Sequence, residues 1–366
     1  QRVVKVIVSN EPGHILRNLS MEPMYRFDLA KLRRVMDGKF EQHNVTGIIN
    51  PSYKEAIEYI DKLERDDKPI AFDIEIIANE TACIGFANNA YRGICINYRD
   101  DSKNRYDLQE ERVLRDRIQQ FFHNKKNRFI AQNGSFDCGW LWFKDRIKVQ
   151  ALWFDTLLAH HTLYPSMPHN LGYLTAQYTD HPYYKDEGKT WREGGNINQF
   201  WHYNVKDCCI TWAVHEQLLK ELTTQKLDDF YFSHVQRLQS HLVLMQVGGV
   251  LADTVLKDDI AEELKGELDD KLNKFHSLVR TATGDSAFRP NPNSPKQLKE
   301  LFFSYLGLVG RGSSTNKDNR QRMRDNPKTS PENVKLLEHL DNYKEEHKFY
   351  STYATMKVDS DNRIRC

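Results

Sequence analysis

The chain has 366 residues, of which 39% are hydrophobic and 11% aromatic, so it can build hydrophobic cores and is not a disordered polypeptide. Its 52 basic and 51 acidic residues leave a net charge of +1, which excludes a generally basic nucleic-acid-binding surface but permits a local basic groove. The apolar stretches are far shorter than the roughly 18 residues of a membrane span. No signal peptide is apparent, and the six cysteines include no CxxC pair. We therefore expect two or three domains in a reducing compartment, neither secreted nor membrane-bound.

The first zone of the sequence, residues 1–65, is expected to contribute a strand and a helix. The β-branched run Val3–Val8 predicts the strand, and Pro51 begins a pattern of apolar residues at close to helical spacing. We expect this zone to pack as an N-terminal extension on the domain that follows.

The second zone, residues 66–222, alternates predicted strands with predicted helices. Mostly apolar runs predict strands at 70–77, 83–87, 93–98 and 129–131, and amphipathic patterns predict helices at 112–124 and 136–144. This alternation predicts an α/β layered fold.

The third zone, residues 223–366, is expected to be almost wholly helical. Ser294–Gln297 is typical of a helix start, with serine as the cap, proline at the first helical position and glutamine able to complete a capping box. A long helix is expected from Pro331 to about Met356. Residues 311–328 are polar, and we expect them to form a mobile segment.

Two carboxylates interrupt the apolar strand expected at residues 70–77. Asp73 and Glu75 are two residues apart, so the strand places both side chains on one face, where their charges repel each other. A cation between them would offset that repulsion. Alone, such a pair is more often a solvated pair at the end of a strand.

Two further motifs add carboxylates to this pair. Asn133–Asp137 places an acid where a short strand turns into a helix, a position that the helix dipole favours for any acidic side chain. Tyr203 and Asp207 are four residues apart, so a helix presents their hydroxyl and carboxylate on one face. Each motif by itself is weak evidence for a site.

Taken in order, the three motifs resemble the signature of the DEDD 3′–5′ exonucleases that carry a tyrosine in the last motif. The zone is similar to the proofreading exonuclease domain of bacterial DNA polymerase I and its phage relatives, and Phe154–Thr156 and Asn170–Leu174 match further segments of that domain. The resemblance implies a ribonuclease H-like mixed sheet flanked by helices. It also implies two divalent metal ions, Mg²⁺ or Mn²⁺, which prefer carboxylate oxygens and catalyse phosphodiester hydrolysis.

The resemblance assigns a role to each residue of the signature. Asp73 would bridge both ions, Glu75 and Asp207 would complete the water-activating site, and Asp137 would hold the second ion through water. Tyr203 would orient the attacking water rather than deprotonate it, because an ordinary phenol has a pKa near ~10. Gln132 and Asn133 are candidates for contacts to DNA or to the metal shell.

The third zone resembles the linker and thumb of family A DNA polymerases, on the segments Met245–Asp253, Asn293–Leu298 and Lys348–Tyr353. Residues 285–328 contain nine Lys or Arg against four Asp or Glu, which predicts a surface that tracks DNA phosphates, although a solvated loop is the simpler alternative. The candidate DNA contacts there are Arg320, Arg322 and Arg324. The palm and fingers of such polymerases are expected beyond Cys366, so we do not expect this chain to add nucleotides.

The sequence as a whole predicts an enzyme, a 3′–5′ exodeoxyribonuclease that releases nucleoside monophosphates from single-stranded 3′ ends and from primer–template DNA. Its full-length parent is expected to be a DNA-directed DNA polymerase of DNA replication in a bacterial or phage-infected cell. An exoribonuclease of the same superfamily is one alternative, since the four acids do not select the sugar. A DNA-binding module without catalysis is another, although all four acids and the tyrosine are present.

Overall fold

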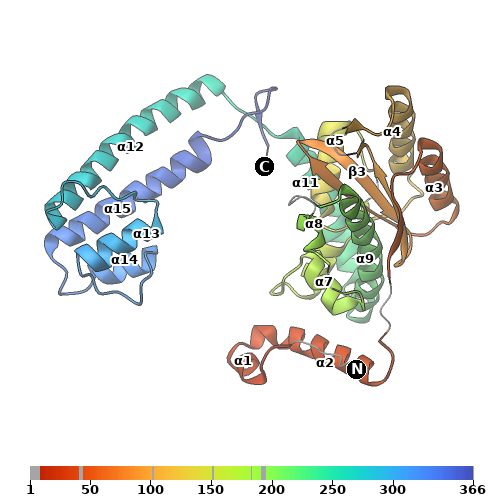
Figure 1. Ribbon diagram of the computed structural model, residues 1–366, viewed down its shortest axis with the longest axis horizontal. Coiled ribbons are helices and arrows are strands. Elements are labelled where there is room, and N and C mark those ends of the chain that lie inside the picture. Colours follow the sequence, from red (N-terminus) through yellow and green to blue (C-terminus); the bar gives the residue numbers. More distant parts are fainter. Residues whose placement is uncertain are drawn as a thin grey trace. The chain divides into compact units, whose positions relative to one another are not determined.

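A computed structural model describes residues 9–40, 44–100, 103–150, 152–182, 184–190 and 195–365. The strand expected at Val3–Val8 lies outside these residues. The chain divides into two compact units, Gln1–Val247 and Gly248–Cys366 (Figure 1). None of the described helices is both long and apolar enough to cross a membrane.

A six-stranded mixed sheet forms the centre of the first unit, in the order β1–β4–β3–β2–β7–β8. Strands β2, β3 and β4 pair antiparallel, whereas β1 runs parallel to β4, β7 to β2 and β8 to β7. The strands are β1 (Thr46–Ile48), β2 (Ile70–Ile77), β3 (Glu80–Ala87), β4 (Arg92–Asn97), β7 (Phe129–Ala131) and β8 (Leu152–Asp155). A separate two-stranded ribbon consists of β5 (Arg99–Asp100) and β6 (Lys103–Asn104). The expectation of a mixed α/β fold is confirmed.

Helices complete this unit on both faces of the sheet. In chain order they are α1 (Pro12–Arg17), η1 (Leu19–Met21), α2 (Glu22–Met36), α3 (Tyr53–Arg65), α4 (Leu108–His123), α5 (Gly134–Asp145), α6 (Thr156–Leu163), α7 (Leu171–Tyr178), α8 (Glu187–Thr190), α9 (Ile197–Thr224), α10 (Asp228–Phe230), η3 (Tyr231–Val235) and α11 (Gln236–Gly248). Helix α3 begins at Tyr53 rather than at Pro51, because Ser52 and Glu55 form a complete capping box at its start.

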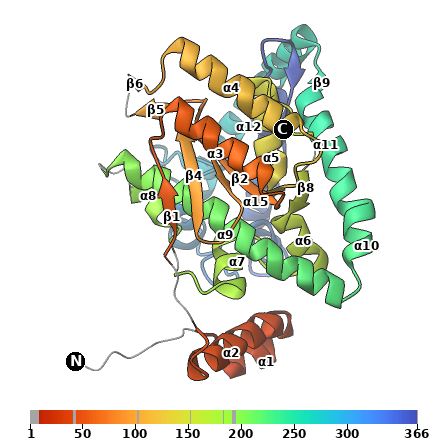
Figure 2. The same ribbon diagram turned by 90° about the vertical axis from the view of Figure 1, so that its right-hand side faces the viewer.

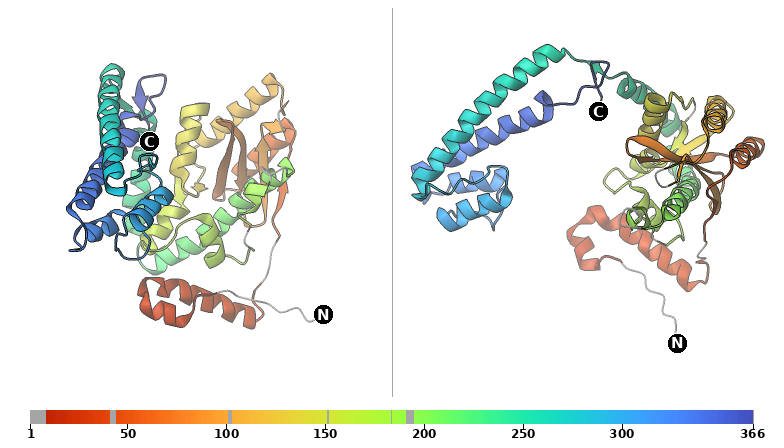
Figure 3. Two further views of the ribbon diagram at one scale, coloured as in Figure 1. Left: turned by 60° about the vertical axis from the view of Figure 1, so that its left-hand side comes forward. Right: turned by 45° about the horizontal axis from the view of Figure 1, so that its top comes forward.

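Helices cover both faces of the sheet (Figures 2 and 3), and the two faces bury different sets of side chains. Phe72 and Ile74 of β2 belong to the core that α3, α4 and α5 cover. Ala71 belongs to the core on the other face, which includes α6, α7 and α9. Because side chains alternate along a strand, the odd-numbered residues of β2 all point toward the face that α9 covers. This alternation decides where the acids of β2 lie.

Helix α2, which the sequence did not predict, packs on the α7 end of the first unit. Phe27 makes edge-to-face contacts with the rings of Tyr164 and Tyr178. Lys31 donates a hydrogen bond to the carbonyl oxygen of Ala176, and Arg34 forms an ion pair with Asp180. The N-terminal extension is therefore mainly helical where the structure describes it.

The second unit is helical around one hydrophobic core. Its elements are β9 (Val250–Leu251), α12 (Thr254–Thr283), α13 (Pro295–Lys299), η4 (Glu300–Tyr305), α14 (Lys317–Arg324), α15 (Pro331–Phe349), η5 (Tyr350–Ala354) and β10 (Arg363–Ile364). The long helices α12 and α15 lie side by side, with α13 and α14 near one end of the pair (Figure 1). Their core includes Phe275, Phe302 and Leu337.

The polar segment 311–328, which we expected to be mobile, is partly helical. It contains helix α14, which Asn316 caps by accepting a hydrogen bond from the backbone N–H of Asn319. Met323 of this helix is fully buried in the core of the second unit. The helix forms because the apolar Met323 and the buried, ion-pairing Arg320 anchor an otherwise polar sequence.

Candidate active site

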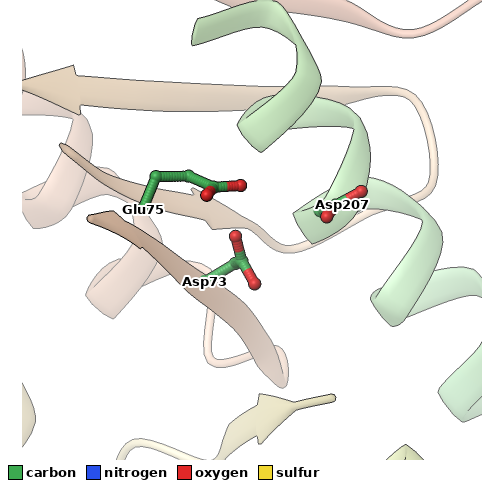
Figure 4. A group of neighbouring side chains, drawn as sticks. All are labelled: Asp73, Glu75 and Asp207. Carbon is green, nitrogen blue, oxygen red and sulfur yellow. The ribbon is translucent and has the colours of Figure 1, made fainter. Parts of the chain in front are cut away.

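Strand β2 and helix α9 bring three carboxylates together on one face of the sheet. Asp73 and Glu75 project from β2 as the period-two alternation predicts, and Asp207 projects toward them from α9 (Figure 4). One oxygen of each carboxylate lies within 4.8 Å of an oxygen of the other two. The structure thus unites two motifs that are far apart in the sequence.

A glycine on the neighbouring strand allows α9 to approach so closely. Gly85 of β3 pairs with Asp73 across the sheet, and a Cβ atom added to it would lie 2.3 Å from Asn204 Oδ1 and 2.7 Å from Cys208 Sγ. The backbone of α9 can therefore come near enough for Asn204 Nδ2 to donate a hydrogen bond to Asp73 Oδ2, at 2.9 Å. A larger residue at position 85 would push α9, and Asp207 with it, away from the strand.

Both carboxylate oxygens of Asp207 accept hydrogen bonds from the segment before α8. The Tyr184 hydroxyl donates to Oδ1 at 2.5 Å, and Lys185 Nζ donates to Oδ2 at 2.6 Å. The same Lys185 ammonium donates to the hydroxyl oxygen of Tyr203 at 2.9 Å. These contacts fix Asp207 and Tyr203 relative to each other on α9.

Burial and mutual repulsion control the protonation of this group. Burial raises the pKa of Asp73 well above its usual range, and the carboxylates of Asp207 and Glu75 raise it further. Burial and the same acidic neighbours also raise the pKa of Tyr203, so its phenol keeps its proton at neutral pH. Tyr203 can donate a hydrogen bond here, but it cannot act as a base.

Asp137 lies beside the three acids, in the first turn of α5. Its Oδ1 accepts a hydrogen bond from the backbone N–H of Ile74, the residue between Asp73 and Glu75, at 3.2 Å. Burial raises the pKa of Asp137 to about 7. It is thus a fourth acid next to β2 but outside the group of three that share close oxygens.

The loop before α5 is held by Asp155 at the end of β8. Its carboxylate is 1% exposed and accepts hydrogen bonds from the backbone N–H groups of Asn133 and Gly134. Gln239 of α11 donates to the same carboxylate at 2.5 Å. Asn133 adopts a positive φ of 59°, and asparagine tolerates this left-handed conformation better than most residues. Asp155 therefore helps to set the position of Asp137.

Gln132 and Asn133 lie on this loop with different surroundings. Gln132 donates to the carbonyl oxygen of His169 at 2.8 Å and accepts from the Thr156 hydroxyl, so its amide already has partners within the protein. Asn133 is exposed. Of the two candidates, Asn133 is the one whose side chain is available to a nucleic acid.

Three carboxylates at this spacing fit a hard divalent cation, because Mg²⁺ and Mn²⁺ prefer oxygen ligands and need anionic charge to offset dehydration. Residues 50–223 match the family model for a 3′–5′ exonuclease. These residues are a 3′–5′ exonuclease domain similar to that of family A DNA polymerases. The expected family and enzyme class are thereby confirmed.

Two known proteins place the exonuclease domain in a larger context. DNA polymerase I of Geobacillus stearothermophilus is 24% identical over 239 residues, which are 63% of this chain and 25% of that protein. The chain therefore spans about a quarter of the length of this curated relative. The POL domain of Pol1 from M. smegmatis, solved with DNA primer-template and dNTP, is similar with a TM-score of 0.58 and 15% identity. That likeness covers 87% of this chain and 52% of the other, and it shows the fold alone.

In the second unit, the structure corrects one expected DNA contact. Arg320 is 4% exposed and forms an ion pair with Asp341 of α15, so its guanidinium is not available to a phosphate. Arg324 contacts the same carboxylate at 3.1 Å with a side chain that is 17% exposed. Arg322 is exposed and remains a candidate.

Sequence reasoning missed several residues that build the exonuclease site. Lys185, Tyr184 and Asn204 all contact its acids, and Asp155 holds its loop. Asn204 lies inside the YxxxD motif three residues before Asp207, so helical spacing alone indicates that its amide lies on the same side of the helix as this acid. Lys185 gave no such signal, because nothing in the local sequence ties it to α9.

Proposed function

We propose that the exonuclease domain hydrolyses 3′-terminal phosphodiesters of DNA with two divalent metal ions and releases nucleoside monophosphates. The observation that carries this proposal is the group of Asp73, Glu75 and Asp207, whose oxygens lie within 4.8 Å of one another. When bound, the ions would supply water activation and neutralise charge on the phosphate and leaving oxygen. Asp73, Glu75 and Asp207 would hold them, with Asp137 as an outer ligand through water.

The remaining residues of the site orient the reactants. Tyr203 keeps its proton, so its hydroxyl donates a hydrogen bond to the attacking water and fixes the direction of attack. Asn204 holds the Asp73 carboxylate by its amide and leaves the other oxygen of that carboxylate open to a cation. Asn133, exposed on the loop beside Asp137, would contact the terminal nucleotide.

We further propose that the parent protein is a DNA polymerase of DNA replication, and that primer–template DNA is its substrate. The support is the similarity to DNA polymerase I and to a polymerase structure that holds primer-template DNA. The exonuclease would act on frayed or mismatched ends, because unpairing a matched end costs on the order of a few kcal/mol.

A 3′-labelled oligonucleotide assay tests the function directly. With Mg²⁺ or Mn²⁺ the chain should shorten single-stranded DNA from its 3′ end to mononucleotides, and EDTA should stop the reaction. Matched DNA and RNA oligonucleotides distinguish the two sugars. Faster cleavage of RNA would replace the proposal with an exoribonuclease, and no cleavage of either would leave a binding module.

A further inference from the structure

Lys185 occupies an unusual position for a cation next to a metal-binding group. Its ammonium lies 2.6 Å from Asp207 Oδ2 and 2.9 Å from the Tyr203 hydroxyl. Two aromatic rings flank it, with centroids 4.8 Å away for Tyr203 and 5.2 Å for Tyr184. Oxygen atoms and ring faces together hold one positive charge against the acidic cluster.

This positive charge faces the carboxylate that the proposed metal ion requires. Asp207 Oδ1 accepts a hydrogen bond from the Tyr184 hydroxyl, and Oδ2 accepts one from Lys185. A metal ion that binds Asp207 through either oxygen therefore lies next to a hydrogen-bond donor of the protein. A hydroxyl can stay beside a metal ion, because it is neutral. An ammonium cannot stay as close, because a divalent ion and a monovalent cation repel each other strongly at short range.

We propose that Lys185 is a resident counter-ion of the acid cluster, which competes with the divalent cation for Asp207 and so lowers the affinity of the site for metal. This inference rests on the proposed metal-dependent function and adds a residue that regulates it. Without metal, the ammonium offsets the repulsion among Asp73, Glu75 and Asp207. When metal binds, Lys185 leaves Asp207 while its side chain, 22% exposed, reaches toward solvent.

The neighbouring Lys206 offers a matched control for long-range charge. It precedes Asp207 on the same helix, and its ammonium also lies near the Tyr184 ring, with 5.9 Å to the centroid. Its ion-pair partner, however, is Glu187 rather than an acid of the cluster. Lys206→Met therefore removes one positive charge close to the site without removing a contact to its carboxylates.

The experiment measures Mn²⁺ binding by electron paramagnetic resonance on the chain as it is, with no substrate. The Kd for Mn²⁺ is compared among five proteins: the wild type, Lys185→Met, Lys185→Arg, Lys206→Met and Asp73→Ala. We expect Lys185→Met to lower the Kd for Mn²⁺ by about 10-fold, because the competing charge is gone. Lys185→Arg and Lys206→Met should stay within about 2-fold of the wild type, because the first variant keeps the positive charge and the second removes a charge that is paired with Glu187 rather than with the cluster. Lys185→Gln replaces the methionine variant if that variant does not fold.

A second readout is the melting temperature in EDTA. Lys185→Met should melt at a lower temperature than the wild type, because the three acids lose their counter-ion. Added Mn²⁺ should then raise the melting temperature of this variant by more than it raises that of the wild type. An unchanged or higher Kd in Lys185→Met, or an equal drop in Lys206→Met, would overturn the role of Lys185. Absence of Mn²⁺ binding in the wild type, with no difference from Asp73→Ala, would instead overturn the proposed function.

Discussion

The two units each contain buried acids beside cations, but the balance of charge is opposite. In the exonuclease domain, Asp73, Glu75 and Asp207 lie together, and the ammonium of Lys185 pairs with Asp207. In the second unit, Asp341 faces two guanidinium groups, those of Arg320 and Arg324. The first arrangement keeps surplus negative charge that a divalent cation can offset, whereas the second leaves none.

This difference separates the proposed metal-binding site from a structural ion pair. Burial, together with the neighbouring carboxylates, raises the pKa of Asp73 and of Asp137, and folding tolerates these two acids at a cost in stability. The Arg320–Asp341 pair connects α14 to α15 and needs no ligand to complete it. The comparison predicts that removing an acid harms function in the first unit, whereas removing a cation harms stability in the second.

The largest effect is expected for Asp73→Ala. Loss of the central acid should reduce cleavage of a 3′-labelled single strand by roughly 10³-fold or more, because the proposed metal ions lose a shared ligand. Unfolding by urea in EDTA should show a stability equal to or slightly above that of the wild type, since a repulsive buried carboxylate is gone. Cleavage at the wild-type rate would show that the site has been misplaced.

A smaller loss is expected for Tyr203→Phe. The variant removes one orienting hydroxyl and no carboxylate, so cleavage should slow by about 10- to 1000-fold. Mn²⁺ binding should persist, because the three acids remain. A variant that had also lost its affinity for Mn²⁺ would assign Tyr203 to the metal-binding group.

The stability of the metal-free protein should depend on pH through Asp137. Its pKa is about 7 in the folded protein and near 3.8 in the unfolded chain, so the folded state binds more protons between these values. Stability should therefore be highest below about pH 4 as far as this group contributes, and should fall by a few kcal/mol as pH rises through 7. Asp137→Asn should flatten this part of the profile in urea titrations with EDTA, and a profile unchanged by the substitution would contradict the assignment.

In the second unit, Arg320→Ala should destabilise the fold. The variant leaves the buried Asp341 carboxylate with only one of its two guanidinium partners, Arg324. The free energy of unfolding should therefore fall by about 3 kcal/mol, which is at the low end of the range for breaking a buried ion pair because Arg324 remains. Hydrogen exchange of the α14 and α15 amides in the full chain measures this loss of stability in the second unit. The exposed Arg322→Ala is the matched control and should change stability by less than about 0.5 kcal/mol. Replacing Arg320 and Asp341 together with methionine and leucine should restore most of the loss.

The sequence predicted the parts of the fold that depend on local patterns. The strand at 129–131 was predicted with its observed bounds, because Phe129–Ala131 is a short, fully buried apolar run. The shared face of Asp73 and Glu75 follows from strand geometry alone, and the start at Ser294 follows from cap chemistry, since Ser294 accepts from the N–H of Gln297. That Asp207 and its helix lie beside β2 was predicted only from the family signature.

Features that depend on distant partners were not predictable in the same way. A count of charges showed a basic segment at 285–328, but it did not show that Asp341 on α15 neutralises Arg320. Likewise, Lys185 lies on an irregular segment, and only the folded chain brings it to Asp207. The sequence does not show where a Lys or Arg side chain points, and the role of that side chain depends on which acid the tertiary structure brings next to it.

The smallest expected effect concerns the exposed cations of the second unit. Lys299 of α13 and Arg322 of α14 are exposed, and Lys299 lines a shallow concavity of about 700 Å³ together with Lys317, Lys344 and Ser313–Asn316. If these side chains contact DNA phosphates, Lys299→Ala and Arg322→Ala should each lower the log–log salt slope of duplex binding by about 0.9. Cleavage of a short single strand should hardly change, since that substrate requires the exonuclease site alone. A slope that stays at the wild-type value in both variants would show that the exposed basic surface, like the buried Arg320, has no part in binding DNA.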